Sequence, residues 1–322
     1  MGQADETSSK SRFYRVSIHA LIALGLIASG TQKFIEFNGF CVIPNNTQRK
    51  GYNGVAYLNE SNTFLARITP VLLTFNEAPN IGRVLDKLTW ASEVLVVDSG
   101  SDDETLEILR RYINVRCVYR RFDSHAAQWN FAISEAGVLT DWVLALDADY
   151  VLTDQLLSEI AVLDPDVGYV GFRTRFRYCV AGKPLRGALY PAVTTLFVRL
   201  KGRYAQVGHT QRITLDGIVT SLNGFIDHDD RKPLARWLWA QDRYSALEAE
   251  WLLDKPLSEL RIQDRLRRML LITPWLVPLY CLTVKRGAFD GWAGLYYALQ
   301  RGVAEAVLAL KLIEHRHVRS GK

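Results

Sequence analysis

The sequence predicts an α/β fold in which a mostly parallel sheet is flanked by helices, and two observations lead to this prediction. The segments 68–77 and 93–105 each contain a short run of β-branched and other apolar residues that breaks into polar turn residues. Helix-forming sequence follows each break, and this alternation of strand and helix is typical of parallel sheets. Ligands bind at the carboxyl ends of the strands in such folds, so polar residues at those ends are candidate site residues.

A further strand is predicted to end in two carboxylates one residue apart, Asp147 and Asp149. In an extended segment side chains two apart point to the same side, so both carboxylates are expected to project together. Two hard oxygen donors suit Mg²⁺ or Mn²⁺, which also takes phosphate oxygens from a nucleotide. An isolated pair of this kind is more often a surface turn, but this pair is not isolated. Other polar residues fall at neighbouring strand ends: Thr74, Asn76, Glu77 and Asp98.

Length and composition allow one sizeable α/β core with an appendage, since the chain has 322 residues of which 48% are hydrophobic. Lysine and arginine (39) outnumber aspartate and glutamate (34), which favours anionic surfaces without requiring them. No recognised nucleic-acid-binding motif accompanies the basic residues, so nucleic acid is not an expected partner. The four cysteines lack metal-type spacing, and a reducing cytosol is the expected compartment. The sequence does not indicate the oligomeric state.

Several motifs together resemble family 2 glycosyltransferases. They lie at 72–77, 96–105, 128–133 and 141–149, and the likeness continues through 208–211, 228–233 and 286–291. The resemblance covers about residues 67–315 and extends to the branch that includes lipopolysaccharide-core β-glucosyltransferases. It implies a glycosyltransferase-A fold with a Rossmann-like sheet. It also implies inverting transfer of a sugar from a nucleoside diphosphate donor, of UDP type, to a cell-envelope glycan or glycolipid.

The resemblance implies a set of nucleotide-sugar-binding residues: Thr74, Asn76, Glu77, Asp98, Gln128, Asn130 and Asp147. Asp98 is implied to accept hydrogen bonds from uracil or ribose, and a turn-forming role is the alternative. In the first loop Glu77 is the expected ligand contact, and Asn76 the expected turn residue. The family places a polar residue beside the donor diphosphate in this region, so Gln128 and Asn130 are implied to line the donor site. A helix is predicted to end near residue 136.

The second loop also contains a predicted helix start. Ser101 followed by Glu104 fits a capping box that opens a helix over 105–112. We therefore assign Asp102 and Asp103 to helix-start electrostatics and not to the chemistry.

Sugar transfer needs two functions that carboxylates can provide, namely holding a metal ion and accepting a proton. Negative charge builds on the departing diphosphate, and a metal held by Asp149 with Asp147 nearby would stabilise it. The acceptor hydroxyl must lose its proton to a base, for which Asp229 and Asp230 are the candidates. One of the pair is expected to act while the other binds Arg231 or Lys232. The alternative is a charged loop that caps the helix beginning near Leu234.

Candidate acceptor-binding or phosphate-binding residues are Arg175, Arg186, Tyr190 and His209. Alternation places Arg173, Arg175 and Arg177 on one side of a strand, where guanidinium groups can bind phosphate. A solvated strand face is the alternative. The sequence departs from the family pattern twice: it lacks the pentapeptide Gln-x-x-Arg-Trp, and it has His209-Thr210 where related core glucosyltransferases carry His-Glu.

Three regions are predicted: an amino-terminal extension at 1–65, a catalytic domain at 66–256 and a helical carboxyl-terminal region at 257–322. The apolar run at 16–30 is too short for a confident membrane span. An amphipathic basic helix at 257–271 and the apolar segment 270–282 suit the interface of an anionic membrane. A buried hairpin against the core is the alternative. The expected location is the cytoplasmic face of the inner membrane, as a peripheral or monotopic protein.

Two other functions remain open at this point. A sugar-phosphate nucleotidyltransferase would share the crevice and the metal, and it would release pyrophosphate. A catalytically inactive peripheral membrane binding protein would keep the fold without turnover.

Overall fold

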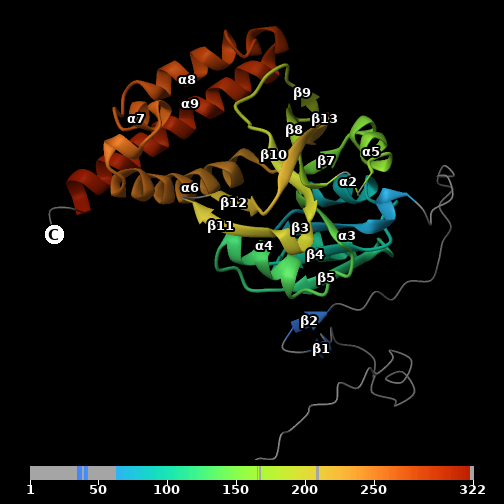
Figure 1. Cartoon of the computed structure of the whole chain (residues 1–322). Helices are drawn as coiled ribbons and strands as arrows, with labels where there is room; N and C mark the ends of the chain where they lie inside the picture. Colours follow the sequence, from blue (N-terminus) through green and yellow to red (C-terminus); the bar gives the residue numbers. More distant parts are fainter. Residues whose placement is uncertain are drawn as a thin grey trace, which may run out of the picture. The chain divides into compact units, whose positions relative to one another are not determined.

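The computed structural model describes residues 35–37, 40–42, 63–164, 166, 168–207 and 210–319. Within these ranges an eleven-stranded sheet has the order β1-β2-β5-β4-β3-β6-β10-β8-β13-β7, and β9 pairs with β8 (Figure 1). A separate pair, β11 and β12, forms a two-stranded sheet. The structure is therefore an α/β fold with a mixed sheet.

Four central strands form a parallel block, as predicted. They are β3 (Ile68–Thr74), β4 (Val94–Asp98), β5 (Val115–Tyr119) and β6 (Trp142–Asp147). The register pairs Thr74 with Asp98 and Leu73 with Asp147. The polar residues that end β3, β4 and β6 therefore lie side by side at the carboxyl ends of these strands.

The other part of the sheet is mixed, so the prediction of a mostly parallel sheet was too simple. β10 (Val193–Val198) is antiparallel to both β6 and β8 (Tyr169–Val180). β13 (Ile218–His228) is parallel to β8, and β7 (Tyr150–Leu152) is antiparallel to β13. The chain returns from β8 through β9 (Lys183–Pro184) without a crossover helix, which gives antiparallel pairing. The pair β1 (Ile35–Phe37) and β2 (Phe40–Val42) adds to β5.

Both faces of the parallel block are covered, because alternate residues of each strand enter two different apolar clusters. On one face lie α2 (Ile81–Asp86), α3 (Thr105–Leu109) and α5 (Asp154–Ala161). On the other lie α4 (His125–Ser134) and the hairpin of β11 (Gly202–Val207) and β12 (Thr210–Leu215). Short 3₁₀ helices, η1 (Phe64–Arg67) and η2 (Arg199–Lys201), precede β3 and β11.

The carboxyl-terminal part is helical, as predicted. The long helices are α6 (Leu234–Asp254), α8 (Thr273–Leu282) and α9 (Trp292–Ile313), and a π-helical turn (Glu314–Arg319) follows. The predicted single helix over 257–271 is instead η3 (Leu257–Glu259) and α7 (Ile262–Arg267), because Leu260 is extended and buried. The 3₁₀ helix η4 (Gly287–Asp290) joins α8 to α9. Among the described residues, no helix combines the length and apolarity that a membrane crossing needs.

Candidate active site

The loop after β3 is held by the loop after β4. Asn76 has a left-handed backbone with φ of 56°, which asparagine tolerates better than most residues. Its side-chain Nδ2 donates to Asp102 Oδ1 at 2.7 Å, and its Oδ1 accepts from the Asp102 backbone N–H at 2.9 Å. Its own backbone N–H donates to Ser101 Oγ. The prediction that Asn76 is a turn residue is confirmed.

Asp98 is buried, and its carboxylate is engaged in the turn. Oδ1 accepts from Thr74 Oγ1 at 3.0 Å and Ser101 Oγ at 2.6 Å. Oδ2 accepts from the backbone N–H groups of Gly100 at 2.8 Å and Ser101 at 2.9 Å. These four bonds use the lone-pair positions of a carboxylate. The turn-forming alternative is confirmed, and the uracil contacts of Asp98 and Thr74 stay predictions.

The helix after this turn begins at Thr105 as predicted, but its cap differs. Asp103 Oδ1 accepts from the Thr105 N–H at 2.9 Å, while Glu104 makes no side-chain cap. Ser101 Oγ is engaged with Asp98 and Asn76. The predicted capping box was therefore wrong, because the serine hydroxyl holds the two loops together instead of the helix end.

The polar residues of α4 hold neighbouring backbone. Buried Gln128 accepts from Arg120 Nη1 at 2.5 Å and donates to Ser99 Oγ at 2.9 Å. Asn130 accepts from the Tyr204 N–H and donates to the Tyr204 carbonyl, both at 2.9 Å, which fixes β11 against α4. Both amide groups are thus paired within the protein, and their predicted donor contacts remain predictions.

Asp147 ends β6, and Asp149 lies in the turn that leads to β7. Burial, followed by repulsion from Asp149, raises the pKa of Asp147 to about 6. Burial acts to raise the pKa of Asp149 as well, but the charge of His228 outweighs it, so that pKa lies below its usual value. His228 Nε2 is 3.1 Å from Asp149 Oδ2. The two carboxylates therefore meet the end of β13.

Three tyrosine rings enclose His228. The centroids of Tyr150, Tyr178 and Tyr190 lie 5.2, 4.9 and 4.8 Å from the imidazole centroid. Among the described residues, His228 Nδ1 is a buried ring nitrogen without a hydrogen-bond partner. Tyr190, predicted to shape the acceptor pocket, also bonds the hydroxyl of Tyr150. The sequence motif His-Asp-Asp contained His228, but spacing alone did not indicate its contact with Asp149.

A partly buried contact between Lys232 and Glu77 joins the loop after β3 to the segment after β13. Lys232 Nζ lies 2.6 Å from Glu77 Oε1 and 3.9 Å from Asp230 Oδ1. Burial, only partly offset by Lys232, raises the pKa of Glu77 to about 7. Burial lowers the pKa of Lys232, but Glu77 and Asp230 outweigh it and leave that pKa above its usual value. Asp149 is near enough to affect both groups.

Asp229 and Asp230 differ sharply in their surroundings. Asp229 is buried, and its carboxylate binds Arg83 Nη1 at 2.6 Å, Arg231 Nη2 at 2.7 Å and the Gly182 N–H at 2.9 Å. Asp230 Oδ1 accepts from Asn80 Nδ2 at 2.9 Å and the Lys232 N–H at 3.0 Å. The expectation that one member binds Arg231 is confirmed for Asp229. Arg83 and Asn80 had no local sequence signal.

The residues present fit a divalent cation that is completed by substrate. No group of three histidine, cysteine, aspartate or glutamate side chains suited to a metal occurs in the described part of the chain. Mg²⁺ is commonly held by only one or two carboxylates together with substrate phosphates and water. Asp147 and Asp149 supply that number of hard oxygen ligands, and each carboxylate is close enough to repel the other. A bound cation would relieve that repulsion.

The candidate acceptor arginines lie on other parts of the fold. Arg177 pairs with Asp227 at 2.7 Å, and Arg175 lies over the Phe225 ring at 4.4 Å. Arg173 and Arg175 are exposed, in agreement with the solvated-face alternative. Arg186 pairs with Asp290 at 3.3 Å, which brings it to the helical region. His209 lies outside the described residues.

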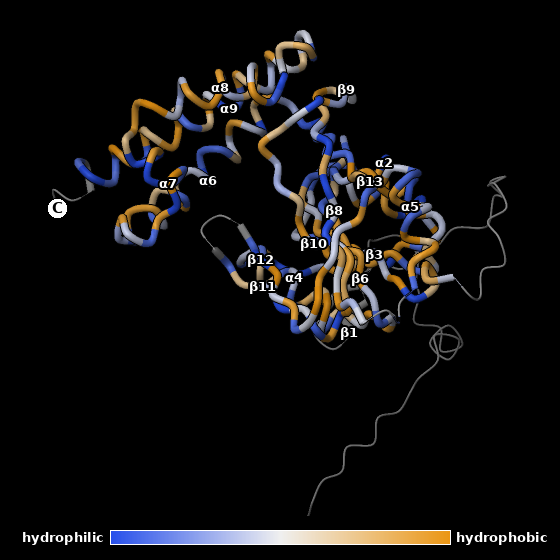
Figure 2. Tube along the Cα trace, turned by 45° about the horizontal axis from the view of Figure 1, so that its top comes forward, coloured by the Kyte–Doolittle hydropathy of each residue, from blue (hydrophilic) through white to orange (hydrophobic). Residues whose placement is uncertain are grey.

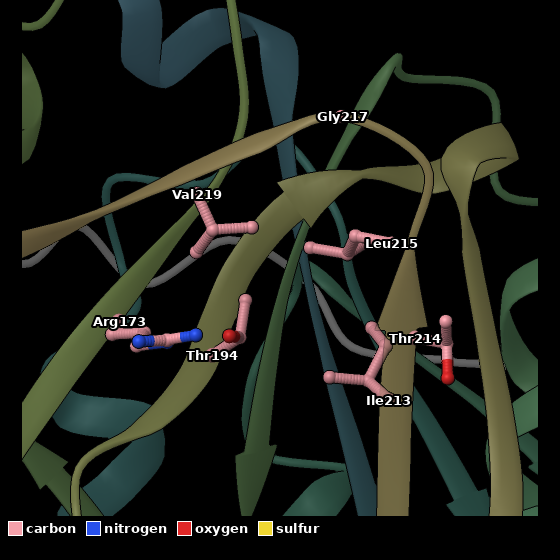
Figure 3. A pocket seen from close by; sticks show the side chains of 7 residues that line it. All are labelled: Arg173, Thr194, Ile213, Thr214, Leu215, Gly217 and Val219. Atoms are coloured by element: carbon pink, nitrogen blue, oxygen red, sulfur yellow. The ribbon is translucent and has the colours of Figure 1, made fainter.

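A surface hollow of about 370 Å³ is lined by residues other than the candidate carboxylates (Figure 3). Arg173, Thr194 and the β12 residues 213–215 line it, together with Gly217 and Val219. Val219 is near the start of β13 and His228 is at its end. Thr194, in contrast, lies on β10, which is antiparallel to β6, so the hollow extends along several strands.

Residues 70–201 match the family described as "Glycosyl transferase family 2". The lipopolysaccharide core biosynthesis glycosyltransferase LpsC of Rhizobium meliloti is 25% identical over 57% of this chain and 70% of that protein. An uncharacterized glycosyltransferase of Rickettsia prowazekii is 24% identical over 62% of this chain and 73% of that protein. Another, from Rickettsia bellii, is 35% identical over 29% of this chain and 31% of that protein.

Solved structures that match this chain include S. aureus TarS 1–349 in complex with UDP-GlcNAc. It has a TM-score of 0.40 and 12% identity, and the match covers 79% of this chain and 92% of TarS 1–349. Glucosyl-3-phosphoglycerate synthase from Mycobacterium tuberculosis, in complex with Mn²⁺, UDP and phosphoglyceric acid, has a TM-score of 0.38 and 17% identity. That match covers 57% of this chain and 78% of the synthase. The sequence matches show that the chain carries a family 2 glycosyltransferase domain, which makes it an enzyme of the glycosyltransferase class.

Proposed function

We propose that this family 2 glycosyltransferase moves a hexose from a UDP-type sugar donor to a hydroxyl group of a cell-envelope glycan or glycolipid, with inversion of the anomeric carbon. One observation carries the proposal: the carboxylates at the end of β6 meet His228 at the end of β13 and the charge of Lys232 just beyond it. The printed function of the Rhizobium meliloti relative, lipopolysaccharide core biosynthesis, supports the acceptor class.

Departure of the nucleoside diphosphate requires positive charge near the breaking bond. Asp147 and Asp149 would hold Mg²⁺ or Mn²⁺, which acts as a Lewis acid on the diphosphate when bound. Lys232 adds a fixed positive charge, because its raised pKa keeps the ammonium group protonated at neutral pH. His228 and its three tyrosine neighbours hold the Asp149 carboxylate in place.

Removal of the acceptor proton falls to Asp230 in this proposal. Asp229 is unsuited, because two guanidinium groups and a backbone N–H already bind its carboxylate. Among the described residues, the hydrogen bonds to Asp230 end on Oδ1, so Oδ2 is left to accept a proton. Asn80 and the Lys232 backbone orient that carboxylate.

A panel of nucleotide sugars incubated with the purified full chain tests the proposal. We expect metal-dependent release of UDP from one UDP-sugar, without any need to know the acceptor. Asp154→Asn, which changes an exposed carboxylate paired with Lys87, should leave the rate unchanged. Release of pyrophosphate from a nucleoside triphosphate and a sugar phosphate would replace the proposal with nucleotidyl transfer. No turnover with any donor would favour a binding protein.

A further inference from the structure

One face of α9 is apolar and exposed over residues 292–303 and again at 310–313. Its members recur at helical spacing, and each is more than a third exposed: Trp292, Leu295, Tyr296, Leu299, Val303, Leu310 and Ile313. The three charged residues of α9 lie elsewhere. Arg301 stacks on Trp237 and Tyr297, Glu305 is buried, and Lys311 pairs with Asp242 at 2.7 Å. The exposed face therefore contains no charge.

The neighbouring helix α8 continues this apolar surface. It contains no charged residue, and its exposed members, with the residue just beyond it, are Trp275, Leu276, Leu279, Tyr280 and Val284. Figure 1 shows the two helices side by side, and Figure 2 shows hydrophobic segments on both. They pack closely where Gly302 meets Pro274 and Pro278. We call these exposed residues of the two helices the α8–α9 face.

Such a surface is unusual for a protein that stays in water. Single exposed apolar residues are common, but a contiguous set on two adjacent helices marks an interaction site. The remaining faces of α9 are already used against α6 and α8, so burial among the described residues does not explain the sequence of the exposed face. The described part of the chain therefore leaves the α8–α9 face available to a partner.

The charges around this face indicate the nature of that partner. Between Arg261 and Ile313 all carboxylates are buried, and they belong to Asp264, Asp290 and Glu305. Near the end of α9, the exposed carboxylates of Asp242 and Glu314 both pair with Lys311. Arg261, Arg265 and Arg286 are exposed in the same segment. An apolar surface with exposed cations complements anionic lipid headgroups above acyl chains. Two copies of this face would bring like charges together, which disfavours self-association.

We propose that the α8–α9 face docks on an anionic lipid bilayer, with its aromatic and leucine side chains in the headgroup region. The inner side of α9 reaches the active site. The Tyr297 ring lies 4.8 Å from Tyr178, and Tyr178 lies 4.9 Å from His228. One helix thus contacts both the lipid surface and the enclosure of His228. The docking stands on the exposed face alone and does not depend on the proposed transfer reaction.

Flotation of the full chain with lipid vesicles tests the docking. We expect binding to vesicles of equal parts phosphatidylglycerol and phosphatidylcholine and weak binding to phosphatidylcholine alone. Leu279→Ser combined with Leu299→Ser should weaken binding by about tenfold or more, because two leucines no longer enter the interface. The control is Leu139→Ser with Leu200→Ser, which changes two equally apolar side chains that are 92% and 81% exposed on other elements.

Two further variants distinguish the contribution of charge from that of apolar contact. They also test the docking if the serine variant misfolds. Arg286→Gln with Lys285→Gln should reduce binding to the anionic vesicles severalfold and leave the weak binding to neutral vesicles unchanged. Trp275→Phe with Trp292→Phe retains the apolar surface, so vesicle binding should persist while brominated lipids quench less tryptophan emission.

Two results would overturn the docking proposal. One is equal vesicle binding by the wild type and the folded Leu279→Ser, Leu299→Ser variant. The other is a stable dimer by analytical ultracentrifugation that the same variant abolishes, with no vesicle binding, which would make the face an interface between two copies.

Discussion

Two regions lie at the carboxyl ends of the central strands, and they use their polar groups differently. The first consists of the loops after β3 and β4, and the second of the ends of β6 and β13. In the first region Asp98 and Asn76 are fully engaged in holding two turns together. In the second, partly buried Asp147 lies beside Asp149, and its pKa is raised to about 6. Glu77 of the β3 loop contacts Lys232 of the second region, and burial raises its pKa to about 7. A position at a strand end therefore identifies candidate site residues. Whether a candidate can bind a ligand or only holds a loop in place depends on its unused hydrogen-bonding groups and its charge.

The largest expected effect comes from the β6 end. Asp149→Ala should lower the rate of transfer on the order of a thousandfold, because a charge-stabilising group next to the leaving diphosphate is lost. Asp141→Ala is the matched control, since Asp141 precedes the same strand at its opposite end and is exposed. Initial rates and circular dichroism of both variants check this. A folded Asp149→Ala enzyme with wild-type turnover would contradict the assignment.

The next effect separates the two adjacent aspartates. Asp230→Asn should reduce kcat on the order of a hundredfold with little change in donor KM, because a general base acts on the acceptor. Steady-state kinetics with a defined acceptor measure both constants. If kcat is unchanged in Asp230→Asn and falls only in Asp229→Asn, the roles assigned to the pair must be exchanged.

Asp229→Asn should act mainly on stability. The substitution leaves Arg83 and Arg231 without their anionic partner, and we expect a loss of about 1–3 kcal/mol in the free energy of unfolding. Urea denaturation followed by fluorescence measures it. An Asp229→Asn variant as stable as the wild type would show that the cluster around Asp229 does not hold β9 and α2 in place.

The sequence alone predicted the strands that carry the site but not the contacts between distant residues. Apolar runs that end in polar residues predicted β3, β4 and β6, because burial on both faces of a sheet demands continuous apolar strands. The Arg83–Asp229 and Lys232–Glu77 pairs join residues 146 and 155 positions apart, and no local spacing encodes such contacts. Gln128 and Asn130 resembled site residues, but their partners are supplied by distant backbone and by Ser99.

A smaller effect tests the supporting region. Thr74→Val removes one hydrogen bond to Asp98 at nearly constant volume and should cost about 1 kcal/mol of unfolding free energy. UDP affinity in this folded variant should stay close to that of the wild type. A large loss of UDP affinity without a loss of stability would show that Thr74 contacts the nucleotide.

The smallest effect concerns pH. The folded chain keeps protons on Glu77 and Asp147 at pH values where the unfolded chain has released them, since burial raises both pKa values. The free energy of unfolding should therefore fall as pH rises from about 4 to 7. Urea midpoints across this range should decline less in Glu77→Gln than in the wild type. An identical slope in both proteins would contradict the raised pKa of Glu77.

Isothermal calorimetry of UDP binding tests the central claim most directly. The claim is that the donor binds where the carboxylates at the end of β6 meet the end of β13. We predict that Mn²⁺ strengthens UDP binding to the wild-type chain and that Asp149→Ala abolishes this enhancement while Asp141→Ala retains it. UDP affinity that is the same with and without Mn²⁺, or an enhancement that survives in Asp149→Ala, would contradict the account.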